Sequence, residues 1–172
     1  MPGRACWHGS DTAGLASIRF DLGGRTRLLP NGFKAQMARY WAAMSQENVE
    51  IMRRGYERWS DTGEIRAHPD LVWDVSKLRW PGRQIYSGPE GANQFNAEWA
   101  EAWDGWKLEA EKYINAGERV VVIVNQRGRS KSTGIPVDMR FAQVWSFRDG
   151  QAIRMEMYAN VDEAFEAAGR SE

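Results

Sequence analysis

A run of strand-like segments in the second half of the chain limits the fold more than any other feature. Three segments are strand-like in pattern and length: 106–116, 137–147 and 152–158. Val120–Val124 is apolar at every position, as in a strand that is covered on both faces. Asp149-Gly150 is a strong hairpin signal before the last segment. The chain therefore predicts a meander of long antiparallel strands.

Apolar residues at helical spacing accompany these strands. Ser45 suits the N-cap of a helix whose apolar face is Val49, Met52, Tyr56 and Trp59. A similar spacing over 31–44 indicates a helix before Ser45. A second helix begins near Pro89 and repeats aromatics at Phe95, Trp99 and Trp103, and a last helix covers 162–168.

This order of elements predicts the α+β class. We expect a curved antiparallel sheet wrapped around the N-terminal helices, which makes a cone with an interior pocket. The two apolar faces of Val120–Val124 call for a cover on the outer face as well. We expect a second subunit to supply it, so that the protein is a homodimer through the sheet.

The composition of the chain argues against several partners and cofactors. The 23 basic residues cancel the 23 acidic ones, so nothing favours nucleic acid. No apolar run approaches the ~20 residues of a membrane helix, and we expect no membrane partner. Cys6 is the single cysteine and the chain has two histidines, too few soft ligands for structural zinc. We expect neither a metal nor another cofactor.

Residues 1–43 differ from the remainder. They hold six basic residues against Asp11 and Asp21, and six glycines fall within the first 32 residues. We expect a basic, Gly-rich and poorly ordered extension ahead of one domain, 44–172. A secretory signal needs an apolar run of about 7–15 residues, which is absent, and we expect a cytoplasmic protein. A transit peptide and a functional start at Met44 are alternative accounts of this extension.

Five short sequence segments resemble a known family. They are SQENVE (45–50), YSGPEG (86–91), AGERVV (116–121), RFAQVWSFRDG (140–150) and RMEMY (154–158). Over about 45–169 the chain resembles the SnoaL-like branch of the nuclear transport factor 2-like superfamily. The resemblance implies a ketosteroid isomerase-like cone with a pocket. It leaves the activity open, because the superfamily includes isomerases, cyclases, epoxide hydrolases, dehydratases and non-catalytic binders.

The connection from the first helix to the first strand departs from this pattern. Similar domains usually carry a second short helix there, whereas Asp61 to Pro69 leaves only about nine residues. We expect this lid-like element to be trimmed, which opens the pocket or shifts its mouth.

Asp74 is the first candidate for a catalytic base. Isomerases and cyclases need a carboxylate base and a donor for the developing oxyanion, and similar ketosteroid isomerases place the base at the end of the first strand. Strand alternation argues against this role. If Leu71, Trp73 and Val75 point inward, Asp74 points outward as a solvated residue unless a bulge intervenes.

The last strand offers a second set of catalytic candidates. Glu156 is the alternative base, and Tyr158 is the donor if the polar face of this strand lines the cone. An ion pair of Glu156 with Arg140 or Arg154 is the structural alternative. If the methionine face lines the cone, the pocket is apolar and the polar face meets solvent or a partner chain.

Gln143 is a polar residue on a strand face that is otherwise apolar. A buried amide must be paired, so Gln143 holds a neighbour or contacts a ligand. In similar cyclases this region often carries a histidine that transfers protons. An amide cannot transfer protons near neutral pH, so the replacement favours binding or orientation over catalysis.

Aromatic residues are numerous enough to wall a site for a flat ligand. With Arg140 and Gln143 they form the expected binding set: Trp73, Tyr86, Trp99, Trp103 and Trp145. Aromatics at helical spacing also fill ordinary cores, so one or two of them are expected to touch the ligand. That ligand is a small apolar or aromatic molecule.

Three functions fit these features. The first is a SnoaL-like pocket domain that acts as a cofactor-free isomerase or cyclase on an apolar or aromatic carbonyl compound, with Tyr86 or Tyr158 as donor. The second is a non-catalytic dimeric module for ligand binding or scaffolding. The third is an epoxide-hydrolase-like enzyme, which requires two carboxylates bridged by arginine, and its candidates are Asp74, Arg140 and Glu156.

Overall fold

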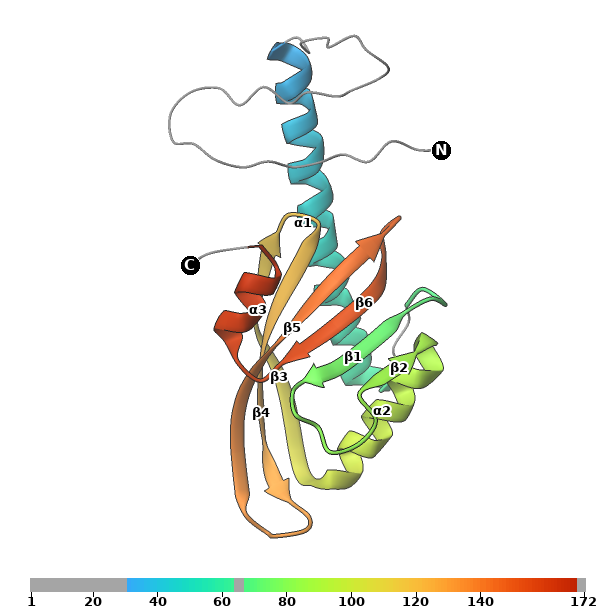
Figure 1. Ribbon diagram of the computed structural model, residues 1–172, viewed down its shortest axis with the longest axis vertical. Coiled ribbons are helices and arrows are strands. Elements are labelled where there is room, and N and C mark those ends of the chain that lie inside the picture. Colours follow the sequence, from blue (N-terminus) through green and yellow to red (C-terminus); the bar gives the residue numbers. More distant parts are fainter. Residues whose placement is uncertain (1–30, 64–66, 170–172) are drawn as a thin grey trace. The chain divides into compact units, whose positions relative to one another are not determined.

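The computed structural model describes residues 31–63 and 67–169 (Figure 1). Its elements, in chain order, are α1 (Asn31–Thr62), β1 (Val72–Lys77), β2 (Ile85–Ser87), α2 (Gly88–Ala102), β3 (Trp103–Ala116), β4 (Arg119–Ser130), β5 (Pro136–Arg148), β6 (Gln151–Tyr158) and α3 (Val161–Ala167). The α+β class is confirmed. The strands β3, β4, β5 and β6 lie where the sequence pattern predicts them.

The six strands form one mixed sheet in the order β2-β1-β6-β5-β4-β3. Every pairing is antiparallel except that of β1 with β6, which is parallel. The expectation of a purely antiparallel sheet is therefore wrong at this pair. β1 and β6 are far apart in the sequence, and local periodicity carries no information on the direction of such a partner.

The first helix is longer than its capping signal suggests. α1 begins at Asn31 and continues through Ser45, so Ser45 is not its N-cap. The Ser45 hydroxyl donates to the carbonyl of Ala42 at 3.0 Å and accepts from Asn115 Nδ2 at 2.8 Å. A serine bonded to the preceding turn is tolerated inside a helix, which explains why the sequence signal misplaces the helix start.

The chain divides into two units between Tyr40 and Trp41 of α1, and the second unit runs from Trp41 to Glu172. Most of the expected extension, residues 1–30 with Cys6, lies outside the described residues, and residues 31–43 belong to α1. Residues 67–71 hold no helix, as expected for a trimmed lid, while 64–66 are outside the description. Within the described ranges, no helix has the length and hydropathy needed to cross a bilayer.

The sheet of the second unit buries both faces. Its inner face packs with α2 and the C-terminal half of α1 around a core that includes Trp73, Phe95 and Met155. Its outer face carries a smaller cluster in which α3 covers Val121 and Val144 (Figure 1). The second apolar face of β4 is thus covered within the chain itself, by α3, and this cover does not require another subunit.

Candidate functional site

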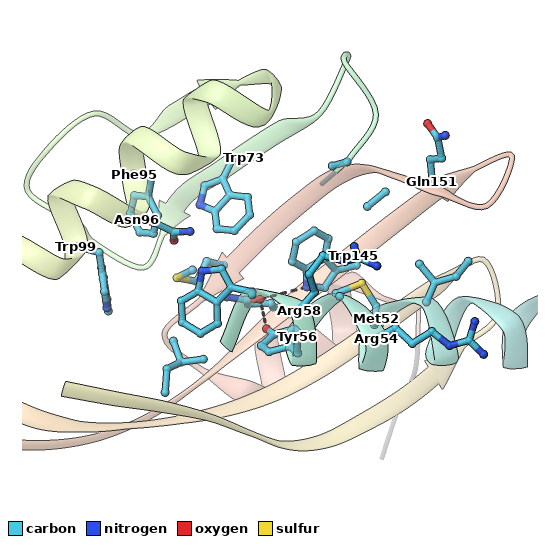
Figure 2. Close-up of a pocket in the computed structure, with 18 of the residues that line it drawn as sticks. Met52, Arg54, Tyr56, Arg58, Trp73, Phe95, Asn96, Trp99, Trp145 and Gln151 are labelled. Atoms are coloured by element: carbon cyan, nitrogen blue, oxygen red, sulfur yellow. Dashed lines mark hydrogen bonds between the residues drawn. The ribbon is translucent and has the colours of Figure 1, made fainter. Parts of the chain in front are cut away.

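A cavity of about 420 Å³ lies on the inner face of the sheet, within the second unit (Figure 2). α1, α2, β1, β3, β5 and the β5–β6 turn all contribute to its wall. The wall is largely apolar and rich in aromatic rings, which come from Trp59, Trp73, Phe95, Trp99, Trp106, Phe141 and Trp145. A cavity of this size with apolar walls is typical of a site for a small organic molecule.

One polar cluster lies in this aromatic wall, and Gln143 is at its centre. The amide oxygen of Gln143 accepts a hydrogen bond from the Tyr56 hydroxyl and another from Trp145 Nε1 at 3.1 Å. Figure 2 shows the two bonds as dashed lines, one from Tyr56 on α1 and one from Trp145 on β5. Gln143 is 5% exposed, so its amide is held in place inside the protein.

Tyr56 contributes a neutral hydroxyl to this cluster. Burial raises the pKa of Tyr56 well above its usual range, and the nearby Tyr113 raises it further. The two rings meet edge to face with centroids 5.7 Å apart. The Tyr56 hydroxyl is therefore protonated near neutral pH and acts as a hydrogen-bond donor to Gln143.

Two further donors in the cavity wall have no partner. Trp73 is 4% exposed, and its Nε1 is buried without a hydrogen bond to any described residue; the same holds for Asn96 Nδ2. In Figure 2 they enter from the same side, Trp73 from β1 and Asn96 from α2. An unpartnered buried donor costs free energy, about 1–3 kcal/mol, which an acceptor on a ligand can recover.

The charged residues of the wall are arginines of α1. Arg54 and Arg58 are both exposed and line the cavity (Figure 2). Arg54 pairs with Glu50 at 3.1 Å, whereas Arg58 has no ion pair with a described residue. Among the described residues that line the cavity, none is Asp, Glu or His. The local charge favours a neutral or anionic molecule, and this part of the wall offers no general base.

The two carboxylates expected as bases lie on the other face of the sheet. Asp74 Oδ2 accepts a hydrogen bond from Arg154 Nη2 at 2.8 Å, and Glu156 is 3.4 Å from the same nitrogen. Met155 packs into the inner core instead. Strand alternation therefore turns the polar face of β6 away from the cavity, as it does Asp74 on β1.

Tyr158 belongs to the same outer face. It is buried in the cluster that α3 covers, and burial raises its pKa. Asp74, Glu156 and Arg154 do form two carboxylates bridged by an arginine, as the epoxide-hydrolase hypothesis requires. The bridging residue is Arg154 rather than Arg140, and none of the three lines the cavity.

Three members of the expected binding set also lie outside this cavity. Tyr86 is fully buried and donates to Glu98 at 2.6 Å; burial, followed by the hydrogen bond to Glu98, raises its pKa to about 12. Arg140 pairs with Glu111 at 2.8 Å. Trp103 and Arg140 line a second hollow of about 750 Å³, which shares Trp99 and Phe141 with the first.

Trp73, Trp99, Gln143 and Trp145 are thus the predicted binding residues that the structure brings together. Sequence reasoning missed Tyr56 as a polar residue of the site and missed Asn96 and Arg58 entirely. Tyr56 has a visible signal, because it occupies the apolar face of α1 with a hydroxyl that must find a partner. Across the described residues, no three His, Cys, Asp or Glu side chains gather as a metal site requires.

Comparisons with known proteins agree with this architecture. Residues 52–155 match the model of the SnoaL-like domain. TerC, whose crystals contain polyporic acid, is 24% identical, with 72% of this chain and 98% of TerC covered and a TM-score of 0.55. A putative SnoaL-like polyketide cyclase from Jannaschia sp. CCS1 is 22% identical, with 74% and 94% covered and a TM-score of 0.52.

A third solved structure extends the same likeness. An NTF2-like protein of unknown function from Burkholderia pseudomallei K96243 is 20% identical, with 70% of this chain and 95% of that chain covered and a TM-score of 0.56. At these identities the likeness shows a shared fold. None of the curated proteins is significantly similar to the chain.

Proposed function

The chain belongs to the SnoaL-like domain family, and we propose that its cavity binds a small, flat and largely apolar molecule without carboxylate-based proton transfer. One observation carries this proposal: the described wall of the cavity is rich in aromatic rings, and it contains no acidic residue and no histidine. Aromatic walls favour a flat ligand by stacking and by area burial. The carboxylates of the catalytic hypothesis are engaged with Arg154 on the outer face.

Gly55 offers a direct test of this proposal. It lines the cavity from α1, and a Cβ added there would meet nothing within 4 Å. Replacing a helical glycine by alanine or leucine stabilises the helix by up to ~1 kcal/mol. Gly55→Leu therefore fills space that a ligand would use while the protein becomes no less stable, and Gly55→Ala is the matched control.

Anthracene-2-carboxylate is a suitable probe, because it is flat, apolar and anionic at one end. We expect the full-length protein to bind it, Gly55→Ala to bind within about threefold, and Gly55→Leu to bind at least tenfold more weakly, by isothermal titration calorimetry. Thermal unfolding shows whether both variants stay folded. Absence of binding to the wild type, or equal binding by folded Gly55→Leu, would contradict the proposal.

We further propose that residues 44–172 contain the whole binding unit, because all described cavity residues lie between Ile51 and Met157. The homodimer and the cytoplasmic location stay predictions. Light scattering on the purified full-length chain measures the first, and localisation of the tagged chain in its own cell measures the second.

A further inference from the structure

We infer that Gln143 selects the ligand, because its amide is held with Nε2 as a donor that an acceptor oxygen of the bound molecule can satisfy. The ligand class is then an aromatic ketone or quinone, in preference to the corresponding hydrocarbon. This inference rests on the proposed function and names the polar group that the cavity recognises.

The orientation of the amide follows from its two neighbours. Trp145 Nε1 can only donate, so the Gln143 atom 3.1 Å away must be the oxygen. The same oxygen meets the Tyr56 hydroxyl, which must therefore donate as well. A flipped amide would place its NH₂ group against Trp145 Nε1, which cannot accept a hydrogen bond. Trp145 thus fixes the orientation of Gln143, Tyr56 donates to the same oxygen, and the Nε2 group has to point elsewhere.

The Nε2 group has no partner among the residues that the structure describes. No described residue accepts a hydrogen bond from it, although Gln143 is 5% exposed and lines the cavity. Unlike Asn96 Nδ2 and Trp73 Nε1, it is not among the fully enclosed unpartnered atoms. It is consequently a donor on the sheet side of the cavity that a bound molecule can reach without rearrangement of the protein.

Two hydrogen bonds to the amide oxygen also strengthen this donor. Chains of hydrogen bonds polarise one another in a low-dielectric interior, so donation by Tyr56 and Trp145 makes the Nε2 hydrogens better donors. A carbonyl oxygen placed there satisfies a group that an apolar ligand would leave unpaired. Sites built in this way discriminate strongly against analogues that lack the matching polar atom.

The test compares two probes and two isosteric variants. Anthraquinone-2-carboxylate and anthracene-2-carboxylate share a ring system and a carboxylate and differ in the carbonyls. Gln143→Glu, measured at pH 8, still accepts from Tyr56 and Trp145 but has no Nε2 hydrogen to donate. Gln46→Glu is the charge-matched control, because Gln46 is exposed on α1 and does not line the cavity.

We expect the full-length wild type to bind the quinone about tenfold more tightly than the hydrocarbon, on the scale of one or two hydrogen bonds. Gln143→Glu should reduce this ratio to twofold or less, whereas Gln46→Glu should keep it. Both variants add one negative charge, and its effect on the two carboxylated probes cancels in the ratio. If Gln143→Glu does not fold, the uncharged double variant Gln143→Met/Tyr56→Phe should show the same loss.

Equal affinities of the wild type for the two probes, or a ratio that persists in a folded Gln143 variant, would overturn the inference. Either result leaves the proposed function intact, since anthracene-2-carboxylate still binds. Failure of both probes to bind the wild type contradicts the proposed function itself.

Discussion

The two faces of the sheet consist of alternate residues of the same strands, and they differ in chemistry. The inner face combines aromatic rings with hydrogen-bond donors, and Gln143 is its polar centre. The outer face holds Asp74, Arg154 and Glu156 beside the apolar cluster under α3. The groups of the inner face line the cavity of about 420 Å³, and Asp74, Arg154 and Glu156 do not.

This difference shows that the position of a carboxylate in the sequence is not enough to assign it a catalytic role. Asp74 is at the strand position expected of a base, yet its neighbours Trp73 and Val75 occupy the inner core. A shift of one residue in a strand exchanges the faces. In this protein, the alternation of side chains along the strands places hydrogen-bond donors toward the cavity. It places the ion-paired carboxylates on the outer face.

The largest expected difference between the faces concerns stability. Phe95 is 2% exposed and packs against Trp73, Tyr86 and Trp99, whereas Phe165 of α3 is only partly buried. Phe95→Ala should lower the free energy of unfolding by about 3–5 kcal/mol, the usual cost of such a cavity. Phe165→Ala should cost less than half of that value. Urea denaturation measures both; similar costs would show that the outer cluster is as important as the inner core.

A smaller effect is expected at the ion-paired group of the outer face. The Asp74 side chain is 11% exposed and that of Arg154 is 40% exposed. Arg154→Leu leaves the Asp74 carboxylate beside Glu156 without its cation, which should lower the free energy of unfolding by about 1–2 kcal/mol. The cost should largely disappear when Asp74→Asn is added. A double-mutant cycle in urea measures this coupling, and independent costs would contradict the pairing.

Alkaline pH should reveal the buried tyrosine of the inner face. The pKa of Tyr86 is raised to about 12, against about 10 in an unfolded chain, so folding favours its neutral form. This contribution is fully present below pH 10 and is lost as the pH rises from 10 to 12. The stability of the wild type should therefore fall more steeply over this range than that of Tyr86→Phe. Parallel pH profiles of urea midpoints would contradict the assigned environment.

The smallest effect should come from neutralising the outer carboxylates. Because Asp74 and Glu156 do not line the cavity, Asp74→Asn and Glu156→Gln should each leave the affinity for anthracene-2-carboxylate within twofold of the wild type. Calorimetric titration measures this affinity. A tenfold change in either folded variant would connect the outer face to the ligand and remove the distinction between the faces.

Local patterns predict much of this fold. The hairpin signal at Asp149-Gly150 and the apolar run Val120–Val124 place β4, β5 and β6, and strand alternation puts Trp73 inside and Asp74 outside. The parallel pairing of β1 with β6 and the cover by α3 are contacts between distant segments. Periodicity reports which residues share a face, and it does not report which segment packs against that face.

The site was predictable only in part, for the same reason. Gln143 could be found because it interrupts an apolar stripe. Its partner Tyr56 is 87 residues away in sequence and looks like an ordinary core aromatic of α1. Tyr86 and Arg140 are suitable ligand residues by type, but Glu98 and Glu111 engage them elsewhere. Pairing between side chains of different elements decided each of these outcomes.

The most direct test of the account is a crystal structure of the full-length protein with anthraquinone-2-carboxylate. We predict the ring system between the aromatic walls of the inner-face cavity, with a carbonyl oxygen within about 3 Å of Gln143 Nε2. The Tyr56 and Trp145 bonds to the amide oxygen should be retained. A probe bound beside Asp74 and Glu156 on the outer face, with the inner cavity empty, would contradict the account.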